Sequence, residues 1–388
     1  MSSDFHQHAP NVFRLLTPAG NLTASGLKRE LEPGPASTLG ARVASFFAQH
    51  ADGADRLVGA MPFDREARDY LYQPAELSFA KFQPRRATRA GDLGSQPWIV
   101  SAEPPAENYG AAVTRALAMM EASKSSAEEL RKIVLSRSLA ITAPQPIDRE
   151  ALMQHLSQDT SVTAFQTPLP GGTAALMGAT PELLVSREGR QVVSHPLAGS
   201  ARRYIDPVRD RESARWLENS NKNQREHREV IEAITDLLAP YCTDIFIPDG
   251  TTLRATATMW HLGTRITATL KSDDTSAAEL AALLHPTPAV CGMPRVASAA
   301  AIRELEEYDR GFYAGAVGWV DRSGDGEWYV ALRCAEVNGC SVRVYSGAGI
   351  VSGSEPEAEI DETSAKFLAM LSALGIDEGG YPLKEIAA

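Results

Sequence analysis

Two glutamates and one lysine near the C-terminal end have the types and the spacing to bind an ionic ligand. Glu359, Glu362 and Lys366 are separated by three and four positions, and residues at these separations lie on one face of a helix. Gly347 and Gly349 come shortly before them, and a backbone without side chains lets its N–H groups approach an anion. The pattern predicts a site at which two carboxylates, an ammonium group and a glycine-rich strand end meet. The alternative is an exposed Glu–Lys pair on a surface helix.

The same helical stripe continues into apolar residues. Met370 and Leu374 follow Lys366 at spacings of four, and Phe367 and Leu371 flank them. The charged residues are therefore in line with the side of the helix that faces the protein interior. This placement favours the site over the exposed pair.

A third glutamate is predicted to point toward the interior. Residues 221–238 have helical periodicity, and Glu226 precedes the apolar Val230 by four positions. A buried carboxylate without a partner is costly, so it needs a cation or a metal ion. The alternative is a first-turn glutamate that interacts favourably with the helix dipole.

Two residues have the chemistry for proton transfer. Lys132 enters an apolar strand in RKIVLSRS, and Glu182 lies among apolar residues in ATPELLV. Burial disfavours the charged form of either residue type. A neutral Lys132 could then act as a base, and a protonated Glu182 as an acid. Taken alone, each residue is also compatible with a solvated charge at the start of a strand.

Arg333 and His261 are polar residues in apolar surroundings. Arg333 alternates with apolar neighbours in a segment that we predict to be a strand, and an inward guanidinium there would need a carboxylate. An outward arginine in a salt bridge is the alternative. His261 follows Trp260 and is either a site residue or a hydrogen-bonded core histidine.

Periodicity and turn residues predict the elements that position these groups. Asp325-Gly326 and Asn338-Gly339 are strong hairpin signals, so we predict an antiparallel meander, which argues against a parallel, doubly wound sheet. The predicted elements are meander strands over 314–320, 327–337 and 341–345, other strands over 12–16, 57–61 and 133–141, and helices over 39–50, 111–122 and 221–238.

The composition excludes several classes of partner. The 388 residues carry a formal net charge of −11, which argues against nucleic acid or an anionic membrane surface as the main partner. No apolar run is long enough to span a bilayer. The four cysteines form no CxxC pair, and the first residues are polar. We therefore expect a cytoplasmic protein, functional as a monomer, without a nucleic-acid or membrane partner.

Together these motifs resemble the chorismate-utilising enzymes, which include isochorismate, salicylate, anthranilate and aminodeoxychorismate synthases. The resemblance covers residues 128–374 and rests on the order and spacing of the motifs. It implies an α+β fold with stacked, largely antiparallel sheets and flanking helices. It also implies a single catalytic unit over residues 1–388, in which residues 1–108 are less characteristic.

The resemblance implies a metal site and a substrate site. Glu226, Glu359 and Glu362 would bind Mg²⁺ as an oxygen-only set of ligands, which suits a hard cation. The family usually has another acid where this chain has Asn223. The implied residues for chorismate are Gly199, Ser200, His261, Ala289, Tyr313, Arg333, Gly347, Gly349 and Lys366, with the arginine on the pyruvyl carboxylate.

Within the family, LVGAMPFD at 57–64 and HPTPAVCGMP at 285–294 most resemble isochorismate synthases of catechol-siderophore pathways. The implied reaction adds water at ring carbon 2, with Lys132 as base, while Glu182 protonates the hydroxyl that leaves carbon 4. An isochorismatase would follow only as the next pathway enzyme. The alternative is a salicylate synthase, in which Tyr313 and Leu332 are common and pyruvate is then eliminated. Ala198 replaces the nucleophilic lysine of aminodeoxychorismate synthases and excludes that subclass.

Overall fold

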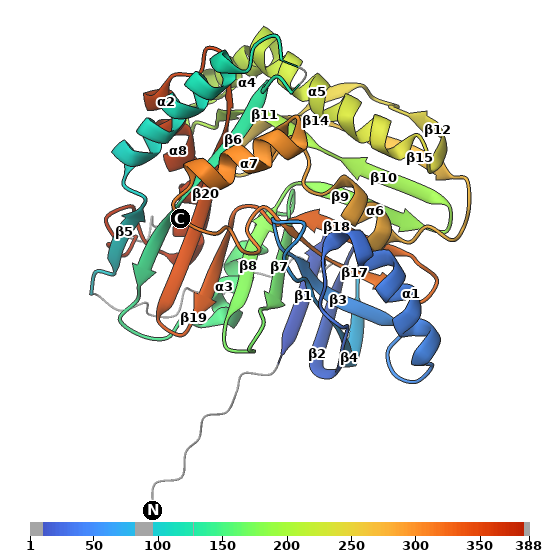
Figure 1. Ribbon diagram of the computed structural model, residues 1–388. Helices are drawn as coiled ribbons and strands as arrows, with labels where there is room; N and C mark the ends of the chain where they lie inside the picture. Colours follow the sequence, from blue (N-terminus) through green and yellow to red (C-terminus); the bar gives the residue numbers. More distant parts are fainter. Residues whose placement is uncertain (1–10, 82–95, 127, 384–388) are drawn as a thin grey trace, which may run out of the picture.

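The protein has an α+β fold in which helices flank large antiparallel sheets (Figure 1). A computed structural model describes residues 11–81, 96–126 and 128–383. Within these residues every strand pairing is antiparallel. This confirms the predicted fold class. None of the helices in the described ranges is long and apolar enough to cross a bilayer.

Two sheets contain all the strands of the described residues. The small sheet has the order β11 (Leu197–Arg202), β14 (Met259–Thr264) and β13 (Thr251–Ala255). The large sheet consists of β1 (Val12–Thr17), β2 (Gly20–Glu30), β3 (Arg56–Met61), β4 (Tyr70–Ala80), β5 (Ile99–Glu103), β6 (Lys132–Thr142), β7 (Thr163–Pro168), β8 (Ala175–Thr180), β9 (Leu183–Glu188), β10 (Gln191–His195), β12 (Cys242–Phe246), β15 (Ile266–Leu270), β16 (Gly292–Met293), β17 (Ala316–Asp321), β18 (Gly326–Val330), β19 (Cys334–Asn338) and β20 (Ser341–Val351).

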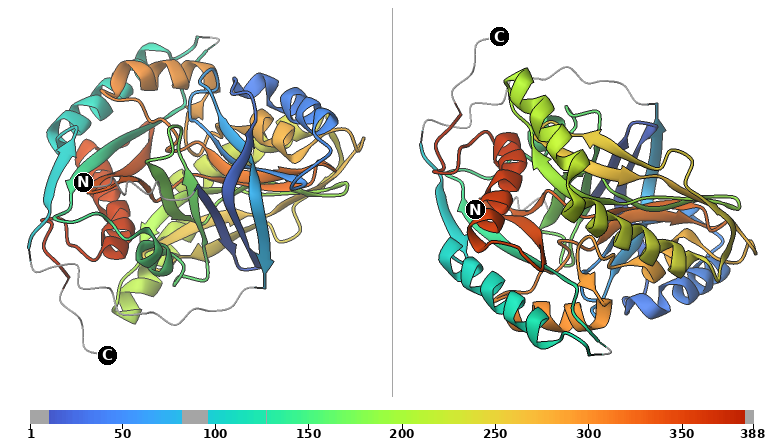
Figure 2. Two further views of the ribbon diagram at one scale, coloured as in Figure 1. Left: turned by 90° about the horizontal axis from the view of Figure 1, so that it is seen from below. Right: turned by 90° about the horizontal axis from the view of Figure 1, so that it is seen from above.

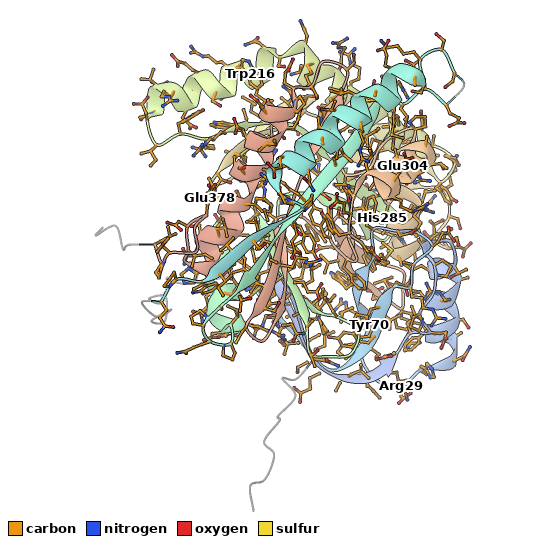
Figure 3. The ribbon with its side chains drawn as sticks, turned by 60° about the vertical axis from the view of Figure 1, so that its left-hand side comes forward. Arg29, Tyr70, Trp216, His285, Glu304 and Glu378 are labelled. Atoms are coloured by element: carbon orange, nitrogen blue, oxygen red, sulfur yellow. The ribbon has the colours of Figure 1, made fainter. Side chains whose placement is uncertain are left out.

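The helices cover different parts of the sheets (Figures 1 and 2). They are η1 (Ala36–Thr38), α1 (Leu39–Gln49), α2 (Ala106–Ala122), α3 (Arg149–Leu156), α4 (Pro207–Asn219), α5 (Asn221–Leu238), α6 (Ala277–Leu284), α7 (Arg295–Leu305) and α8 (Pro356–Leu374). α2, α7 and α8 pack on β6 and β20, α4 and α5 on the small sheet, and α6 on β9, β17 and β18. Trp216 lies on the outer side of α4 and is 61% exposed (Figure 3).

The longest strand pairing joins β6 and β20 over eleven positions, with Lys132 opposite Val351. α8 follows β20 in the chain and packs against it. The helix buries the predicted apolar stripe, and Gly375 ends it in the left-handed conformation at φ 74°, which glycine adopts without strain. The end of β20 and the start of α8 are therefore held against β6, where Lys132 begins the strand.

The predicted meander is wrong as a single unit. Its two hairpins form, β17 with β18 and β19 with β20, but β18 pairs next with β9 and β19 with β8. The expected strand over 327–337 is broken because Arg333 adopts a left-handed backbone conformation at φ 48°. A non-glycine residue in this region is strained and is often functional.

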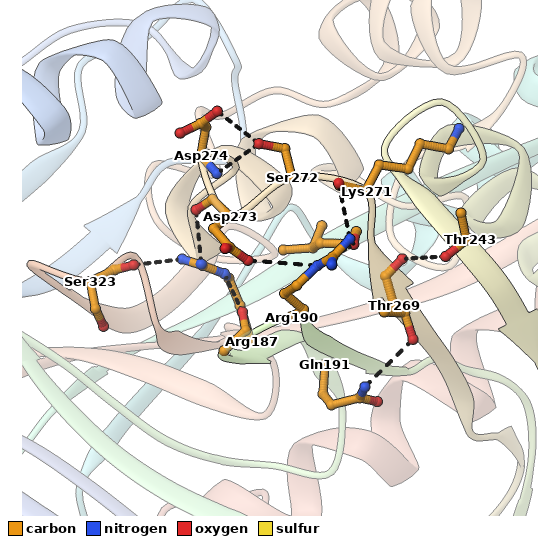
Figure 4. Close-up of polar contacts among 12 residues, drawn as sticks. Arg187, Arg190, Gln191, Thr243, Thr269, Lys271, Ser272, Asp273, Asp274 and Ser323 are labelled. Atoms are coloured by element: carbon orange, nitrogen blue, oxygen red, sulfur yellow. Dashed lines mark hydrogen bonds and ion pairs between the residues drawn. The ribbon is translucent and has the colours of Figure 1, made fainter.

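In a polar cluster at the end of β9, the buried Arg187 connects several loops through hydrogen bonds (Figure 4). Arg187 is 5% exposed and donates to the carbonyl oxygens of Gly189, Asp273 and Ser323 at 2.8–2.9 Å. None of these residues lines the pocket described below. The cluster therefore joins loops without contacting that pocket.

Candidate active site

One pocket brings together thirteen of the fourteen predicted site residues. Its walls come from β6, β20, α8, the first turns of α5, the small sheet, the 287–291 turn and the loops before β9, β17 and β19. The predicted residues that line it are Glu182, Gly199, Ser200, Glu226, His261, Ala289, Tyr313, Arg333, Gly347, Gly349, Glu359, Glu362 and Lys366.

Lys132 is the remaining one, and it lies directly behind the pocket wall. Its side chain is 2% exposed, and its Nζ donates to Glu226 Oε1 at 2.7 Å. A Cβ atom at position 349 would come within 2.8 Å of the lysine Cε. Gly349 thus leaves the space that Lys132 occupies beside the pocket, and the alternative of a solvated charge is excluded.

Glu182 is buried and has an unused acceptor. The residue is 3% exposed, and its Oε1 has no hydrogen-bond partner among the described residues. Burial raises the pKa of Glu182 to about 8, although the charges of Lys132 and Arg333 and a backbone hydrogen bond from Leu197 act in the opposite direction. The carboxyl group is therefore protonated at neutral pH and can donate a proton into the pocket.

The three carboxylates that were predicted to bind metal each lie near a lysine. Glu226 has the contact described above, Glu362 Oε1 accepts from Lys366 Nζ at 2.7 Å, and Glu359 Oε1 lies 3.8 Å from Lys222 Nζ. Burial and the neighbouring Glu362 raise the pKa of Glu359. Burial opposes ionisation of Glu362 as well, but the charge and hydrogen bond of Lys366, together with Ser200 and Lys222, hold the pKa of that carboxyl below its usual value.

This set of donors fits a hard cation in type. All three groups are carboxylates on one pocket, which is the chemistry that Mg²⁺ prefers. Burial, and then the charge of Glu362, raise the pKa of Glu359, and a bound cation would favour its ionised form. Their present arrangement is open, since no compact group of three metal-binding side chains occurs within residues 11–81, 96–126 and 128–383. The lysine partners would have to share these carboxylates with the ion.

Asn223 lies where the resemblance leads one to expect an acid. It is 8% exposed, and its Nδ2 donates to Ser220 Oγ at 2.9 Å. A Cβ atom at Gly199 would lie 3.1 Å from Asn223 Oδ1, and Gly199 itself has a φ of 76°. The amide therefore borders the pocket without adding negative charge, and Gly199 is needed for both space and backbone conformation.

Arg333 supplies a buried positive charge to the pocket wall. Its guanidinium donates to Thr256 Oγ1 at 3.1 Å and to His261 Nε2. Burial lowers the pKa of Arg333 to about 10, so it stays charged at neutral pH. No carboxylate forms an ion pair with it in the described part of the chain. The outward salt bridge is thus wrong, and a ligand carboxylate would complete the site.

His261 is neutral and acts as an acceptor. Burial, followed by the nearby charges of Arg333 and Lys366, lowers its pKa well below the ordinary value. A neutral imidazole can accept from the guanidinium through Nε2. His261 is therefore both a buried histidine and a residue of the pocket, where it holds Arg333 in place together with Thr256.

Aromatic and small side chains form another wall. Tyr313 stacks on Tyr345 with ring centroids 4.8 Å apart and an interplanar angle of 8°, and Ala289, Val290 and Leu332 also line the pocket. Flat rings and small side chains suit a cyclic substrate.

Sequence reasoning missed Tyr345 and Lys222, although each carried a signal. Tyr345 precedes Gly347 by two positions in the same strand, and this is the period of one face of a strand. Lys222 precedes Glu226 by four positions in α5, which is the helical spacing used above. Both line the pocket.

Comparison with known proteins agrees with this geometry. A family model described as chorismate binding enzyme matches residues 59–375. Isochorismate synthase DhbC of Bacillus subtilis is 41% identical, over 96% of each chain. Isochorismate synthase EntC of Escherichia coli K12 is 37% identical, over 95% of this chain and 96% of that one.

The crystal structure of a putative 2,3-dihydroxybenzoate-specific isochorismate synthase, DhbC of Bacillus anthracis, superposes with a TM-score of 0.87. It is 36% identical and is matched over 96% of this chain and 98% of its own. The pocket, the fold and these relatives lead to the same conclusion: the chain belongs to the chorismate-binding enzymes.

Proposed function

We propose that the protein is an isochorismate synthase, an isomerase that converts chorismate to isochorismate. The observation that carries the proposal is Glu182, a buried carboxyl group with a pKa of about 8 and a free acceptor at the pocket. A protonated acid is what loss of a ring hydroxyl requires. Lys132 lies behind the same pocket and provides a base.

In the proposed reaction, Lys132 accepts a proton from water while the water oxygen bonds to ring carbon 2. The two ring double bonds shift, and the bond between carbon 4 and its hydroxyl breaks. Glu182 donates its proton to this hydroxyl, which leaves as water. The products are isochorismate, a protonated Lys132 and an ionised Glu182, so one proton must pass back through solvent before the next cycle.

The remaining residues hold the substrate. The buried guanidinium of Arg333 and the ammonium of Lys366 are placed to bind its carboxylates. The Tyr313 and Tyr345 rings form a flat wall for the ring. Glu226, Glu359 and Glu362 would hold Mg²⁺, which would polarise the ring carboxylate of the substrate. The ion would compete with Lys132 for Glu226.

Product analysis tests this function. Purified protein is incubated with chorismate and Mg²⁺, and the mixture is separated by liquid chromatography with a separate enzymatic assay for pyruvate. We expect isochorismate to accumulate to an equilibrium with chorismate, with little pyruvate. Unchanged chorismate would refute the proposal, and pyruvate equal to the chorismate consumed would indicate a salicylate synthase. The reported relatives give that alternative no support, although Tyr313 and Leu332 do line the pocket.

The relatives also suggest a pathway. One solved structure carries the description 2,3-dihydroxybenzoate-specific, and 2,3-dihydroxybenzoate is a catechol. We infer that this chain supplies isochorismate for a catechol siderophore. Growth without added iron tests the role, since a deletion strain should grow normally when 2,3-dihydroxybenzoate is provided and poorly when it is not.

A further inference from the structure

A buried ion pair lies directly behind the pocket and is not used by the proposed chemistry. The side chains of Glu306 and Arg310 are 3% and 2% exposed, and their closest N–O distance is 2.5 Å. Glu304, two residues before Glu306, lies at the surface of α7 (Figure 3). A buried pair of this kind is often no more stabilising than well-packed apolar residues. A role for the pair other than stability would depend on the groups that it contacts.

Arg310 fastens three pieces of the pocket wall. Its guanidinium donates to Val134 O at 2.7 Å and to Val290 O at 3.0 Å, and both of these residues line the pocket. Its own carbonyl oxygen accepts from the backbone N–H of Tyr313 at 2.9 Å. The strand β6 and the 287–291 turn thus meet at the side chain of Arg310, and the turn that carries Tyr313 is held by its backbone.

Glu306 extends this arrangement to the aromatic wall. Its Oε1 accepts from the backbone N–H and the hydroxyl of Ser136 at 2.7 and 2.8 Å, and the Ser136 hydroxyl is 2.7 Å from the Tyr308 hydroxyl. The Tyr308 ring stacks on Tyr345 at 6.2 Å, and Tyr345 stacks on Tyr313. One carboxylate is therefore connected to both rings that face the substrate.

We propose that Glu306 and Arg310 are positioning residues that set the shape of the substrate pocket by fixing its ring-binding wall. This inference rests on the proposed function and adds a determinant of substrate fit to it. The role depends on geometry, because a guanidinium reaches the carboxylate and two carbonyls at once. A lysine at position 310 keeps the charge but cannot make all of these contacts.

The test compares R310K with R187K. Arg187 is a matched control, since it is also buried and also joins loops through backbone carbonyls, but away from the pocket. KM for chorismate is the readout, because a partly unfolded sample lowers the maximal rate and leaves KM unchanged. Contacts with the unreacting part of a substrate act in the ground state and transition state alike, so their loss raises KM.

We expect R310K and R187K both to lose thermal stability. Only R310K should raise the KM for chorismate, by about tenfold or more. E306Q should behave like R310K. If R310K and E306Q fold but keep KM within about twofold of the wild type, the pair is only structural and the proposal is wrong.

If neither R310K nor E306Q folds, the KM of Y308F tests the proposal instead. This substitution removes one hydroxyl and keeps the ring, so we expect the protein to fold and KM to rise about threefold. An unchanged KM in Y308F would then overturn the proposal. Failure of the proposed function is distinguishable, because in that case the wild type itself leaves chorismate unchanged.

Discussion

Replacing Glu182 by glutamine should remove activity and, above neutral pH, make the protein more stable. The wild-type carboxyl group has an ordinary pKa of 4.5 and a folded-state pKa of about 8. A group whose pKa is raised by folding stabilises the protein fully below pH 4.5, and this contribution is lost as the pH rises to 8. The glutamine side chain of E182Q is neutral throughout and has no such loss.

The size of the stability difference between E182Q and wild type follows from the pKa shift of Glu182. A difference of 8 − 4.5, or 3.5 units, corresponds to a free energy on the order of 5 kcal/mol at about 1.4 kcal/mol per unit. The side chain is 3% exposed, so solvent screens little of it. The free energy of unfolding of E182Q relative to wild type should therefore increase between pH 4.5 and 8 and be constant above pH 8.

Urea unfolding in the presence of a chelator, at half-unit steps from pH 5 to 9, measures this difference. E188Q is the control, because Glu188 ends the strand β9 that follows Glu182 but is exposed, and its curve should run parallel to the wild type. In the activity assay, E182Q should lower kcat by about 10²–10⁴-fold, the usual contribution of a positioned acid. Parallel stability curves for E182Q and wild type, or near wild-type turnover, would refute the reasoning.

Three further predictions concern the base and the metal. K132A should fold, as checked by circular dichroism, and lose about 10²–10⁴-fold in kcat; full turnover would remove Lys132 from the mechanism. Chelator-treated protein should be inactive and recover with Mg²⁺, and E359Q should weaken Mg²⁺ binding in calorimetry because an oxygen site depends on ligand charge; activity without metal would contradict this. G349A should lower kcat with little change in melting temperature, because its Cβ would displace the flexible end of Lys132; an unchanged kcat would show that the lysine position is unimportant.

The regular elements could be predicted because their local signals agree with their tertiary environment. α5 begins and ends where periodicity placed it, over Asn221–Leu238, and the β6 strand extends the predicted 133–141 by one residue at each end. The break at Arg333 could not be predicted. Its neighbours alternate as in a strand, but β18 and β19 pair with different partners, and only those pairings require the chain to turn there.

Parts of the site could not be predicted either, because they depend on contacts between residues that are distant in the sequence. Glu306 and Arg310 are spaced like an ordinary surface salt bridge on a helix, and nothing local distinguishes them from the exposed Glu304. Their burial depends on β6 and on the turn at Val290, which are distant in the sequence. Conversely, Lys132 and Glu226 were each predicted for the site, but their direct contact follows only from the fold.

The charges of the pocket explain how a protein with a net charge of −11 can bind a substrate with two carboxylates. With Glu182 protonated and Lys132 neutral, as the proposed reaction requires, three cations face three carboxylates, so the fixed charges sum to zero. A magnesium ion and a dianionic substrate together leave this sum unchanged, whereas either ligand alone changes it by two. An aspartate in place of Asn223 would make the fixed sum −1 and weaken the attraction for a dianion before the metal binds. The groups counted are Lys222, Arg333 and Lys366 against Glu226, Glu359 and Glu362.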